Sequence, residues 1–222
     1  MFTKVFIFNL FLIFSFFSIS TPVIFLPESE GGFEEGGTGK YDKIFNTIHS
    51  YGTIEWELIH LPYKRAIKLF LGSKDACLAI GNTQVALEYF NIEVIDPGIG
   101  YTSNQLVFAT DVNQKVISSQ DDLIDKIIVH IIGESPEIYG FNINEIRTDS
   151  VRNHSQSLKM LHANRIDVIF GITSDFDNID FNYHFDKNFV VLDNYDSIIC
   201  KKTIENVKFL EIFRQALIKY QL

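Results

Sequence analysis

The chain has 222 residues, of which 46% are hydrophobic, and a formal net charge of −9 at pH 7. This length is enough for one large domain or for two lobes of roughly 100 residues each. The acidic charge argues against binding nucleic acid or anionic membranes through bulk charge. Two cysteines are too few for a disulfide-stapled framework, and Cys77 and Cys200 form either one bridge or two buried thiols.

The N-terminal segment has the pattern of a secretory signal peptide. Lys4 precedes an apolar stretch at 5–17, which is shorter than the roughly 20 residues that a membrane-spanning helix needs. Ser18-Ile19-Ser20 then supplies a small-x-small end. We therefore expect residues 1–20 to be a signal peptide that is cleaved before Thr21, so that the mature chain is exported. The alternative is an uncleaved membrane anchor.

Apolar strands alternate with amphipathic helices in the first half of the chain. The apolar runs predict strands at 22–26, 53–61, 76–80 and 92–95. Apolar residues at helical spacing predict helices at 41–49, 63–71 and 84–90. This alternation is typical of βαβ units and a parallel sheet that is covered on both faces.

The second half repeats the alternation with shorter helices. We expect strands at 103–110, 127–132, 144–151 and 166–172, and two further apolar runs at 189–192 and 198–200. Short helices are expected to begin at Ser118 and Pro136, where serine and proline suit a helix start. Longer helices are expected at 155–163 and 204–220.

Two segments half a chain apart share one order of residue types. Residues 67–80 and 158–172 each contain an apolar-striped helix end, a polar turn, a basic residue, an aspartate and an apolar run. A helix that leads into a fully apolar strand is half of a βαβ unit. The repetition suggests two similar lobes with a ligand-binding cleft between them, although any two parallel-sheet units share this pattern.

In this order the segments resemble the type II periplasmic solute-binding proteins, the extracytoplasmic receptors of ABC importers, and among them substrate-binding protein family 3. The resemblance covers nearly the whole chain after residue 20. It is specific for the fold and uninformative about the ligand, because the matching residues belong to the scaffold. The residues that carry it are Leu61-Pro62-Tyr63-Lys64-Arg65-Ala66-Ile67, Asp75-Ala76-Cys77-Leu78-Ala79-Ile80-Gly81, residues 118–133, Ser157-Leu158-Lys159-Met160-Leu161 and Asn164-Arg165-Ile166-Asp167.

The resemblance implies an α/β, two-lobed periplasmic-binding-protein-like II fold. Each lobe would be a mixed, mostly parallel sheet flanked by helices, and two hinge crossovers would join the lobes. Lobe one would contain residues 21–100 and 197–222, lobe two residues 110–193, and the hinge residues 101–109 and 193–197. In this family the returning strand lies antiparallel beside the third strand of lobe one. The resemblance therefore implies that Cys77 and Cys200 lie close together, as a disulfide between them would require.

Ligands of open α/β sheets bind beyond the carboxyl ends of the strands. This rule selects the loops that follow the predicted strands, together with the hinge. The alternative for each selected residue is an ordinary solvated loop position. The residues that we expect to bind ligand are Glu28, Ser29, Tyr63, Arg65, Asn82, Thr83, Tyr101, Asn104, Glu134, Ser135, Arg152 and Thr173.

Two departures from the family pattern bear on the ligand. Family members that bind α-amino acids hold the ligand carboxylate with an arginine after the third or fourth strand of lobe one, but residues 75–114 contain no lysine or arginine. At the helix start near Pro136, Glu134 and Glu137 already supply negative charge where an anion would bind. We expect a small polar ligand that is amino-acid-like, neutral or cationic. Arg65 and Arg152 remain candidates for binding an anion, with surface ion pairing as the alternative.

By resemblance, we expect a periplasmic, monomeric and cofactor-free binding protein that passes a small molecule to an ABC permease. An alternative is a sensor module that presents its ligand to a membrane receptor. An enzyme on the same fold is a further alternative. The chain has no Gly-x-Ser-x-Gly motif, and its six histidines show no metal-ligand spacing. We therefore expect neither catalysis nor a bound metal, and no nucleic-acid partner.

Overall fold

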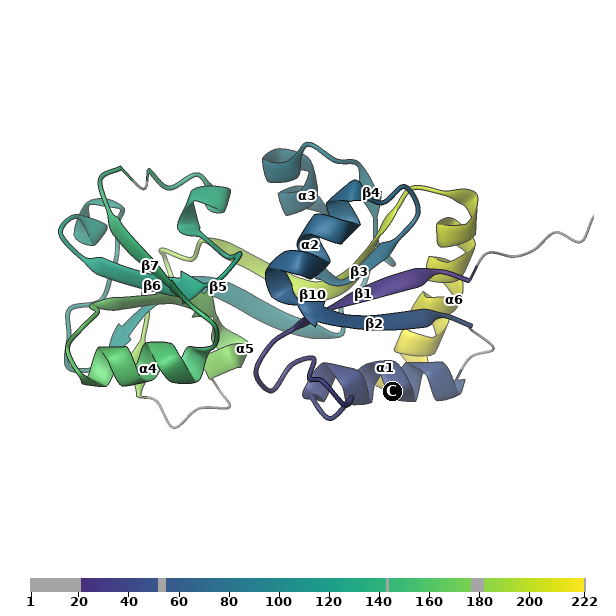
Figure 1. Ribbon diagram of the computed structural model, residues 1–222, viewed down its shortest axis with the longest axis horizontal. Helices are drawn as coiled ribbons and strands as arrows, with labels where there is room; N and C mark the ends of the chain where they lie inside the picture. Colours follow the sequence, from purple (N-terminus) through teal and green to yellow (C-terminus); the bar gives the residue numbers. More distant parts are fainter. Residues whose placement is uncertain (1–20, 52–54, 143, 177–181, 222) are drawn as a thin grey trace, which may run out of the picture.

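The computed structural model describes residues 21–51, 55–142, 144–176 and 182–221. The expected signal peptide, residues 1–20, lies outside the described residues, as does the start of the strand expected at 53–61. Figure 1 shows the described chain as two lobes joined by a pair of long strands. Among the described helices, none combines the length and the apolar character needed to cross a membrane.

Lobe one, on the right in Figure 1, is built from the first part of the chain and from its last helix. Its elements are β1 (Val23–Glu28), α1 (Lys40–Tyr51), β2 (Glu57–Pro62), α2 (Tyr63–Gly72), β3 (Cys77–Gly81), α3 (Thr83–Phe90), β4 (Val94–Ile95) and α6 (Ile204–Gln221). The two long strands are β5 (Thr102–Asp111) and β10 (Leu192–Lys201), and each contributes to both lobes.

Lobe two lies between these long strands in the sequence. Its elements are η1 (Asp121–Leu123), β6 (Ile127–Ile131), η2 (Pro136–Tyr139), β7 (Arg147–Val151), α4 (His154–His162), β8 (Val168–Ile172), α5 (Thr173–Phe176) and β9 (Tyr183–His184). The helix expected at 155–163 and the strands expected at 127–132 and 166–172 are therefore present, with ends that differ by one or two residues.

One continuous strand order, β2-β1-β3-β10-β5-β8-β6-β7, runs through both lobes. In lobe one, β1 is parallel to β2 and β3, and β10 is antiparallel to β3. In lobe two, β6 is parallel to β7 and β8, and β5 is antiparallel to β8. The two lobes thus have equivalent arrangements, and the expected two-lobed α/β fold is confirmed. The apolar runs of the repeated segments, β3 and β8, occupy equivalent places.

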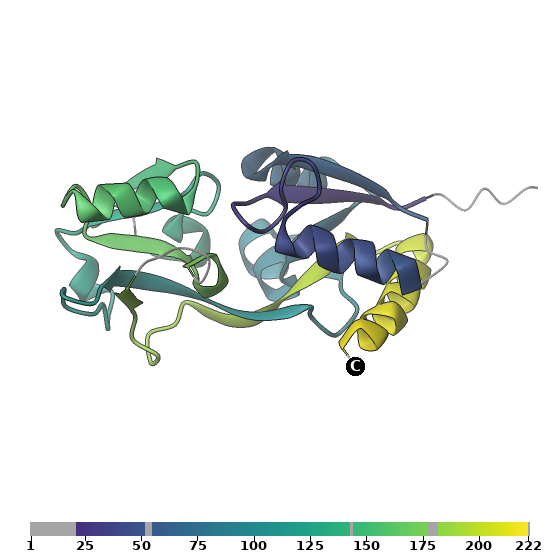
Figure 2. The same cartoon turned by 90° about the horizontal axis from the view of Figure 1, so that it is seen from below.

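Alternating side chains of the strands bury both faces of the lobe-one sheet. On β1, Ile24 and Leu26 pack in the cluster formed with α1 and α6, whereas Phe25 packs on the other face against the α2 cluster. Phe45 of α1 and Phe213 of α6 have ring centroids 5.6 Å apart within that first cluster. Figure 2 shows α1 and α6 lying together on this side of the sheet.

Lobe two is covered differently on its two faces. Leu158 and Leu161 of α4 pack on one face of the sheet. The other face is covered by less regular chain, including Leu123 and Phe141. The helices expected at Ser118 and Pro136 are single 3₁₀ turns, η1 and η2. The second turn ends where Gly140 adopts a left-handed conformation with φ of 84°.

Three features of local structure were not anticipated from the sequence. The apolar run expected at 189–192 does not form its own strand, because β10 begins at Leu192 and the preceding residues pack as loop. The elements α5 and β9 were not predicted. They have four and two residues respectively, which is too short for a period in the sequence to be recognised.

Cys77 and Cys200 are joined in a disulfide with a Cα–Cα distance of 4.0 Å. The two residues are register partners on the antiparallel strands β3 and β10, and both are fully buried in the lobe-one core. The proximity that the family resemblance implied is therefore present in the structure. The bond fixes β10 to the central strand of lobe one.

The variant C77A/C200A is expected to lose about 2–5 kcal/mol of unfolding free energy. The cross-link spans a sequence separation of 123 residues, and closing so long a loop restricts the unfolded chain strongly. Urea unfolding followed by circular dichroism measures the difference. The wild-type chain with a phosphine reductant is the control and should lose a similar amount. Equal stability of oxidised wild type and variant would contradict this role of the bond.

Candidate functional site: a cavity between the lobes

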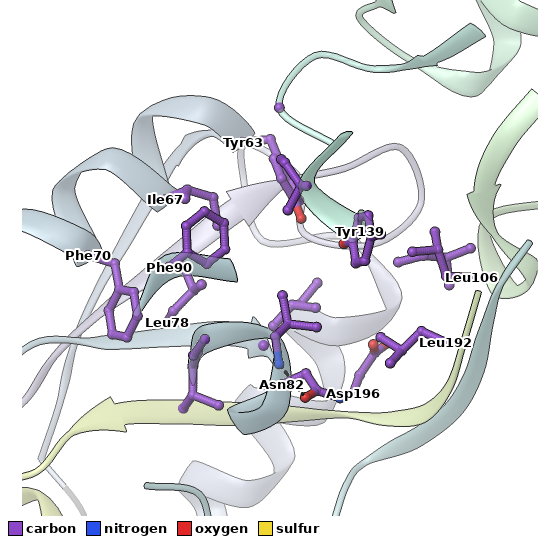
Figure 3. A pocket seen from close by; sticks show the side chains of 18 of the residues that line it. Tyr63, Ile67, Phe70, Leu78, Asn82, Phe90, Leu106, Tyr139, Leu192 and Asp196 are labelled. Carbon is purple, nitrogen blue, oxygen red and sulfur yellow. Dashed lines mark hydrogen bonds between the residues drawn. The ribbon is translucent and has the colours of Figure 1, made fainter. Parts of the chain in front are cut away.

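A cavity of about 110 Å³ lies where the two lobes face each other at the long strands β5 and β10. Both lobes and both long strands contribute to its lining, and it lies beyond the carboxyl ends of β3, β6 and β8. Figure 3 shows it from close by. Among its lining residues are Tyr63, Ile67, Phe70, Leu78, Asn82, Val85, Ala86, Phe90, Ile92, Asn104, Leu106, Gly133, Tyr139, Ile172, Leu192, Tyr195 and Asp196.

The cavity has an apolar end and a polar end. Ile67, Phe70 and Phe90 gather on one side with Leu78, as Figure 3 shows. These side chains belong to α2, α3 and β3 of lobe one. Asp196 lies away from this group, beside Asn82, with Leu192 and Leu106 beyond it. A ligand in this cavity would therefore meet hydrocarbon at one end and a carboxylate near the other.

Asp196 is the centre of a buried hydrogen-bond network at the polar end. Its carboxylate accepts a hydrogen bond from Tyr41 Oη at 2.5 Å and another from Asn104 Nδ2. Burial raises the pKa of Asp196 to about 6, although the hydrogen bond from Tyr41 acts in the opposite direction. Asn104 is 7% exposed, and its Oδ1 has no hydrogen-bond partner among the described residues.

Glu134 is a second buried carboxyl at the boundary between the lobes. It follows Gly133, whose φ of +107° turns the chain beside Tyr63 of lobe one; a Cβ at Gly133 would lie 3.0 Å from Tyr63 Cδ1. Tyr63 donates a hydrogen bond to the Glu134 side chain. Glu134 is 6% exposed, and its Oε2 has no partner among the described residues.

Several charged and titratable groups face Glu134 from the surrounding elements. Burial and the charge of Asp175 raise the pKa of Glu134 to about 7, and Asp196 adds to the increase, whereas His154 and the hydrogen bond from Tyr63 lower it. Tyr139 of η2 also faces this carboxyl, and burial raises its own pKa. Glu134 therefore holds its proton up to near neutral pH.

His154 and Asp175 of lobe two form a hydrogen-bonded pair close to Glu134. His154 Nε2 lies 3.2 Å from Asp175 Oδ2. Burial lowers the pKa of His154, but the hydrogen bond and charge of Asp175, with smaller contributions from Glu134 and Glu30, raise it overall. The carboxylate of Asp175 therefore favours the protonated form of this imidazole.

Direct contacts join the lobes beside the cavity. The carboxylate of Glu30, in the loop after β1, accepts hydrogen bonds from the Ser155 backbone N–H at 3.1 Å and from Ser155 Oγ at 2.5 Å. Glu30 thus lies at the N-terminus of α4, where the helix dipole favours negative charge. Tyr89 of α3 and Tyr139 of η2 also meet, with ring centroids 5.7 Å apart.

Seven of the residues expected at the site border this interlobe region. Tyr63, Asn82 and Asn104 line the cavity itself, and Glu134 contacts it through Tyr63. A wider cavity of about 560 Å³ opens at the cleft mouth. From the expected set, Glu28, Ser29 and Arg152 line this outer space.

The other five expected residues lie elsewhere. Arg65 is exposed on α2 and lines neither cavity. Thr83 is the first residue of α3, and Ser135 caps η2 by accepting from the Glu137 N–H. Tyr101 is buried in the lobe-one core, and Thr173 Oγ1 accepts a hydrogen bond from the Gln105 N–H.

Four residues at the site were missed by the sequence reasoning, namely Tyr139, His154, Asp175 and Asp196. His154 and Asp175 belong to the starts of α4 and α5, and Asp196 lies within a strand. The rule that ligands bind beyond the carboxyl ends of strands selects loop residues. It therefore does not select Asp196, which lies within a strand. A possible signal was the position of Asp196 in the predicted second hinge crossover, where a polar residue is close to both lobes.

No protein-family model and no curated protein sequence matches the chain. Solved structures do match. One is the substrate-binding protein of an amino acid ABC transporter, at 19% identity and TM-score 0.63, covering 90% of this chain and 93% of that chain. Another is a P235GK mutant of ArgBP from T. maritima, at 16% identity and TM-score 0.67, covering 90% and 89%.

A third match is a Salmonella typhimurium periplasmic binding protein with high arginine specificity, at 14% identity and TM-score 0.63, covering 90% of this chain and 93% of that chain. At these identities the likeness establishes the fold. The chain has the two-lobed fold of the type II periplasmic binding proteins, and its neighbours in fold include the substrate-binding protein of an amino acid ABC transporter and a periplasmic binding protein with high arginine specificity.

The variant E134Q is expected to be about 1–3 kcal/mol more stable than wild type at pH 8. The folded-state pKa of Glu134 is about 7, above its ordinary value of 4.5. Between these values the folded state holds a proton that the unfolded state has released, so stability contributed by this group falls as pH rises. Glutamine removes this loss while keeping an acceptor for Tyr63.

Urea unfolding at pH 5 and pH 8 measures the effect. The advantage of E134Q should shrink towards pH 5, where both folded and unfolded carboxyls approach protonation. E137Q, at an exposed position of η2, is the matched control. A stability difference for E134Q that stays constant between the two pH values would contradict the assignment.

Proposed function

We propose that this chain is an exported solute-binding protein that captures a small polar ligand between its lobes and delivers it to an ABC importer. The observation that carries the proposal is the cavity at the hinge, which both lobes and both long strands line. The fold likeness to a substrate-binding protein of an amino acid ABC transporter supports the same class of activity.

The proposed mechanism is closure of the two lobes by bending at the hinge. We propose lobe one at residues 21–100 and 197–222, lobe two at 110–193, and the hinge at 101–109 and 193–197. The antiparallel pairing of β5 with β10, from Leu106↔Leu192 to Thr102↔Asp196, supports this division. A ligand that contacts both lobes stabilises the closed state by its differential affinity for that state.

Export and a periplasmic location rest on the signal-peptide pattern of residues 1–20 and on the periplasmic neighbours in fold. Binding without catalysis is supported by those neighbours, which are binding proteins. It is also supported by the disulfide, which takes up both cysteines of the chain and leaves no thiol nucleophile. We propose that the protein acts as a monomer.

Thermal unfolding against a panel of amino acids, amines, short peptides, organic acids and sugars tests the proposed function. A ligand at 100 times its Kd adds about 2.7 kcal/mol of stability. For a protein of this size we expect a rise in Tm of about 5–11 °C. The rise should be confined to one chemical class. An unchanged Tm with every class would contradict a solute-binding function.

Removing the Glu30 carboxylate is expected to weaken ligand binding by about 3- to 10-fold, because the E30A variant loses hydrogen bonds that join the lobes in the closed state. Small-angle X-ray scattering should show a larger radius of gyration for the unliganded variant. E35A removes the same charge from an exposed position of the same loop and is the matched control. Equal effects of E30A and E35A would contradict a specific interlobe contact.

A further inference from the structure

We propose that the ligand of the interlobe cavity is an organic amine with a protonated ammonium group, an apolar body and no carboxylate. This inference rests on the proposed function and names its ligand class. It follows from four features of the site: its hydrogen-bond acceptors, its charge, the lack of a place for a carboxylate, and its apolar end.

The polar end of the cavity offers acceptors to a ligand. Asn104 donates from Nδ2 to Asp196, which leaves Oδ1 as a buried acceptor that has no partner among the described residues. Glu134 borders the cavity through its contact with Tyr63, and its Oε2, which also has no partner among the described residues, is a second acceptor once this carboxyl is ionised. Tyr41 and Tyr63 direct their hydroxyl protons to the carboxylates. An ammonium group has three donors and no acceptor, so it complements this arrangement.

The charge around the cavity favours a cation. The charge of Asp175 raises the pKa of both Glu134 and Asp196, and the charge of Asp196 also raises the pKa of Glu134. His154 pairs with Asp175, and Lys40 acts on Asp196 from outside the cavity. The described lining of the cavity contains no lysine or arginine. A bound ammonium ion would supply the missing positive charge, whereas an anion would be repelled.

A ligand carboxylate has no cationic partner in this cavity. The segment 75–114, which includes α3, contains no lysine or arginine. The N-terminus of α4, another feature suited to an anion, already carries the Glu30 carboxylate. The side chain of Asn82 occupies the N-terminus of α3 by accepting from the Val85 N–H. Arg152 lies at the wider outer cavity.

The apolar end of the cavity determines the chemical character of the rest of the ligand. Ile67, Phe70, Leu78 and Phe90 provide a hydrocarbon surface there. A second ammonium group would lose its hydration at this end without compensation, which disfavours a diamine. The cavity volume of about 110 Å³ is of the same order as the ~150 Å³ cavity that holds benzene in another protein. A small arylalkyl or branched alkyl amine fits these limits.

Isothermal titration of the full chain with matched probes tests the inference. Phenethylamine and isoamylamine have the ammonium and the apolar body. L-phenylalanine adds the carboxylate, 3-phenylpropionate keeps the carboxylate without the amine, and putrescine replaces the apolar end by a second charge. L-arginine represents the ligand of the neighbours in fold. We expect the monoamines to bind at least 10-fold more tightly than every other probe.

The variant E134Q is expected to weaken binding of the best monoamine by at least 10-fold, whereas E137Q should leave it unchanged. If E134Q binds the amine like wild type, the assigned acceptor is wrong. If L-phenylalanine, L-arginine or putrescine binds as tightly as the monoamines, the ligand class is overturned while the solute-binding function stands. If no member of these probes or of the wider panel binds, the solute-binding function falls as well.

Discussion

The antiparallel pairing of β5 with β10 is the constraint on which the rest of the structure depends. Each strand belongs to the sheets of both lobes, so the pair both connects the lobes and lines the cavity between them. The equivalent order of strands in the lobes then directs the carboxyl ends of β3 and of β6 and β8 towards the same space. Asn104 and Asp196 lie on the paired strands themselves, so the pairing of β5 with β10 fixes their separation.

The acidic groups of the cavity oppose the stability of the protein. Glu134 and Asp196 are both buried, and burial raises the pKa of each because the charged form loses its hydration. The fold retains these groups within a scaffold that is stabilised elsewhere. Four residues after Asp196 on the same strand, Cys200 is bonded to Cys77 of β3 in the lobe-one core. Here groups that lower stability lie on a strand that a disulfide stabilises. This arrangement is typical of proteins in which binding residues reduce the stability of the fold.

The sequence was most informative where the structure depends on local hydrophobic pattern. The repeated segments at 67–80 and 158–172 predicted two similar lobes, and β3 and β8 occupy equivalent places in them. The site was less accessible because its residues meet across the lobes. Tyr101 and Thr173 were selected as residues that follow strands or lie between the lobes. In the structure, Tyr101 packs in the lobe-one core and Thr173 accepts a hydrogen bond from β5. Asp196 and the pair of His154 with Asp175 become neighbours of Glu134 only once both sheets and the hinge are in place, and no spacing within the chain records that arrangement.

The same reasoning explains why a similar fold does not imply that the same ligand is bound. Structures of arginine-bound binding proteins match this chain at 14–15% identity, and the matching pattern is that of strands and covering helices. Arginine carries a carboxylate, which in a buried site needs a cation or a helix N-terminus for compensation. This chain lacks lysine and arginine across 75–114 and fills the N-terminus of α4 with Glu30. The lack of lysine and arginine is visible in the sequence, whereas the position of Glu30 at the N-terminus of α4 depends on a contact between the lobes. Because they are independent and act in the same direction, the scaffold of an amino-acid receptor is compatible here with a ligand of different charge.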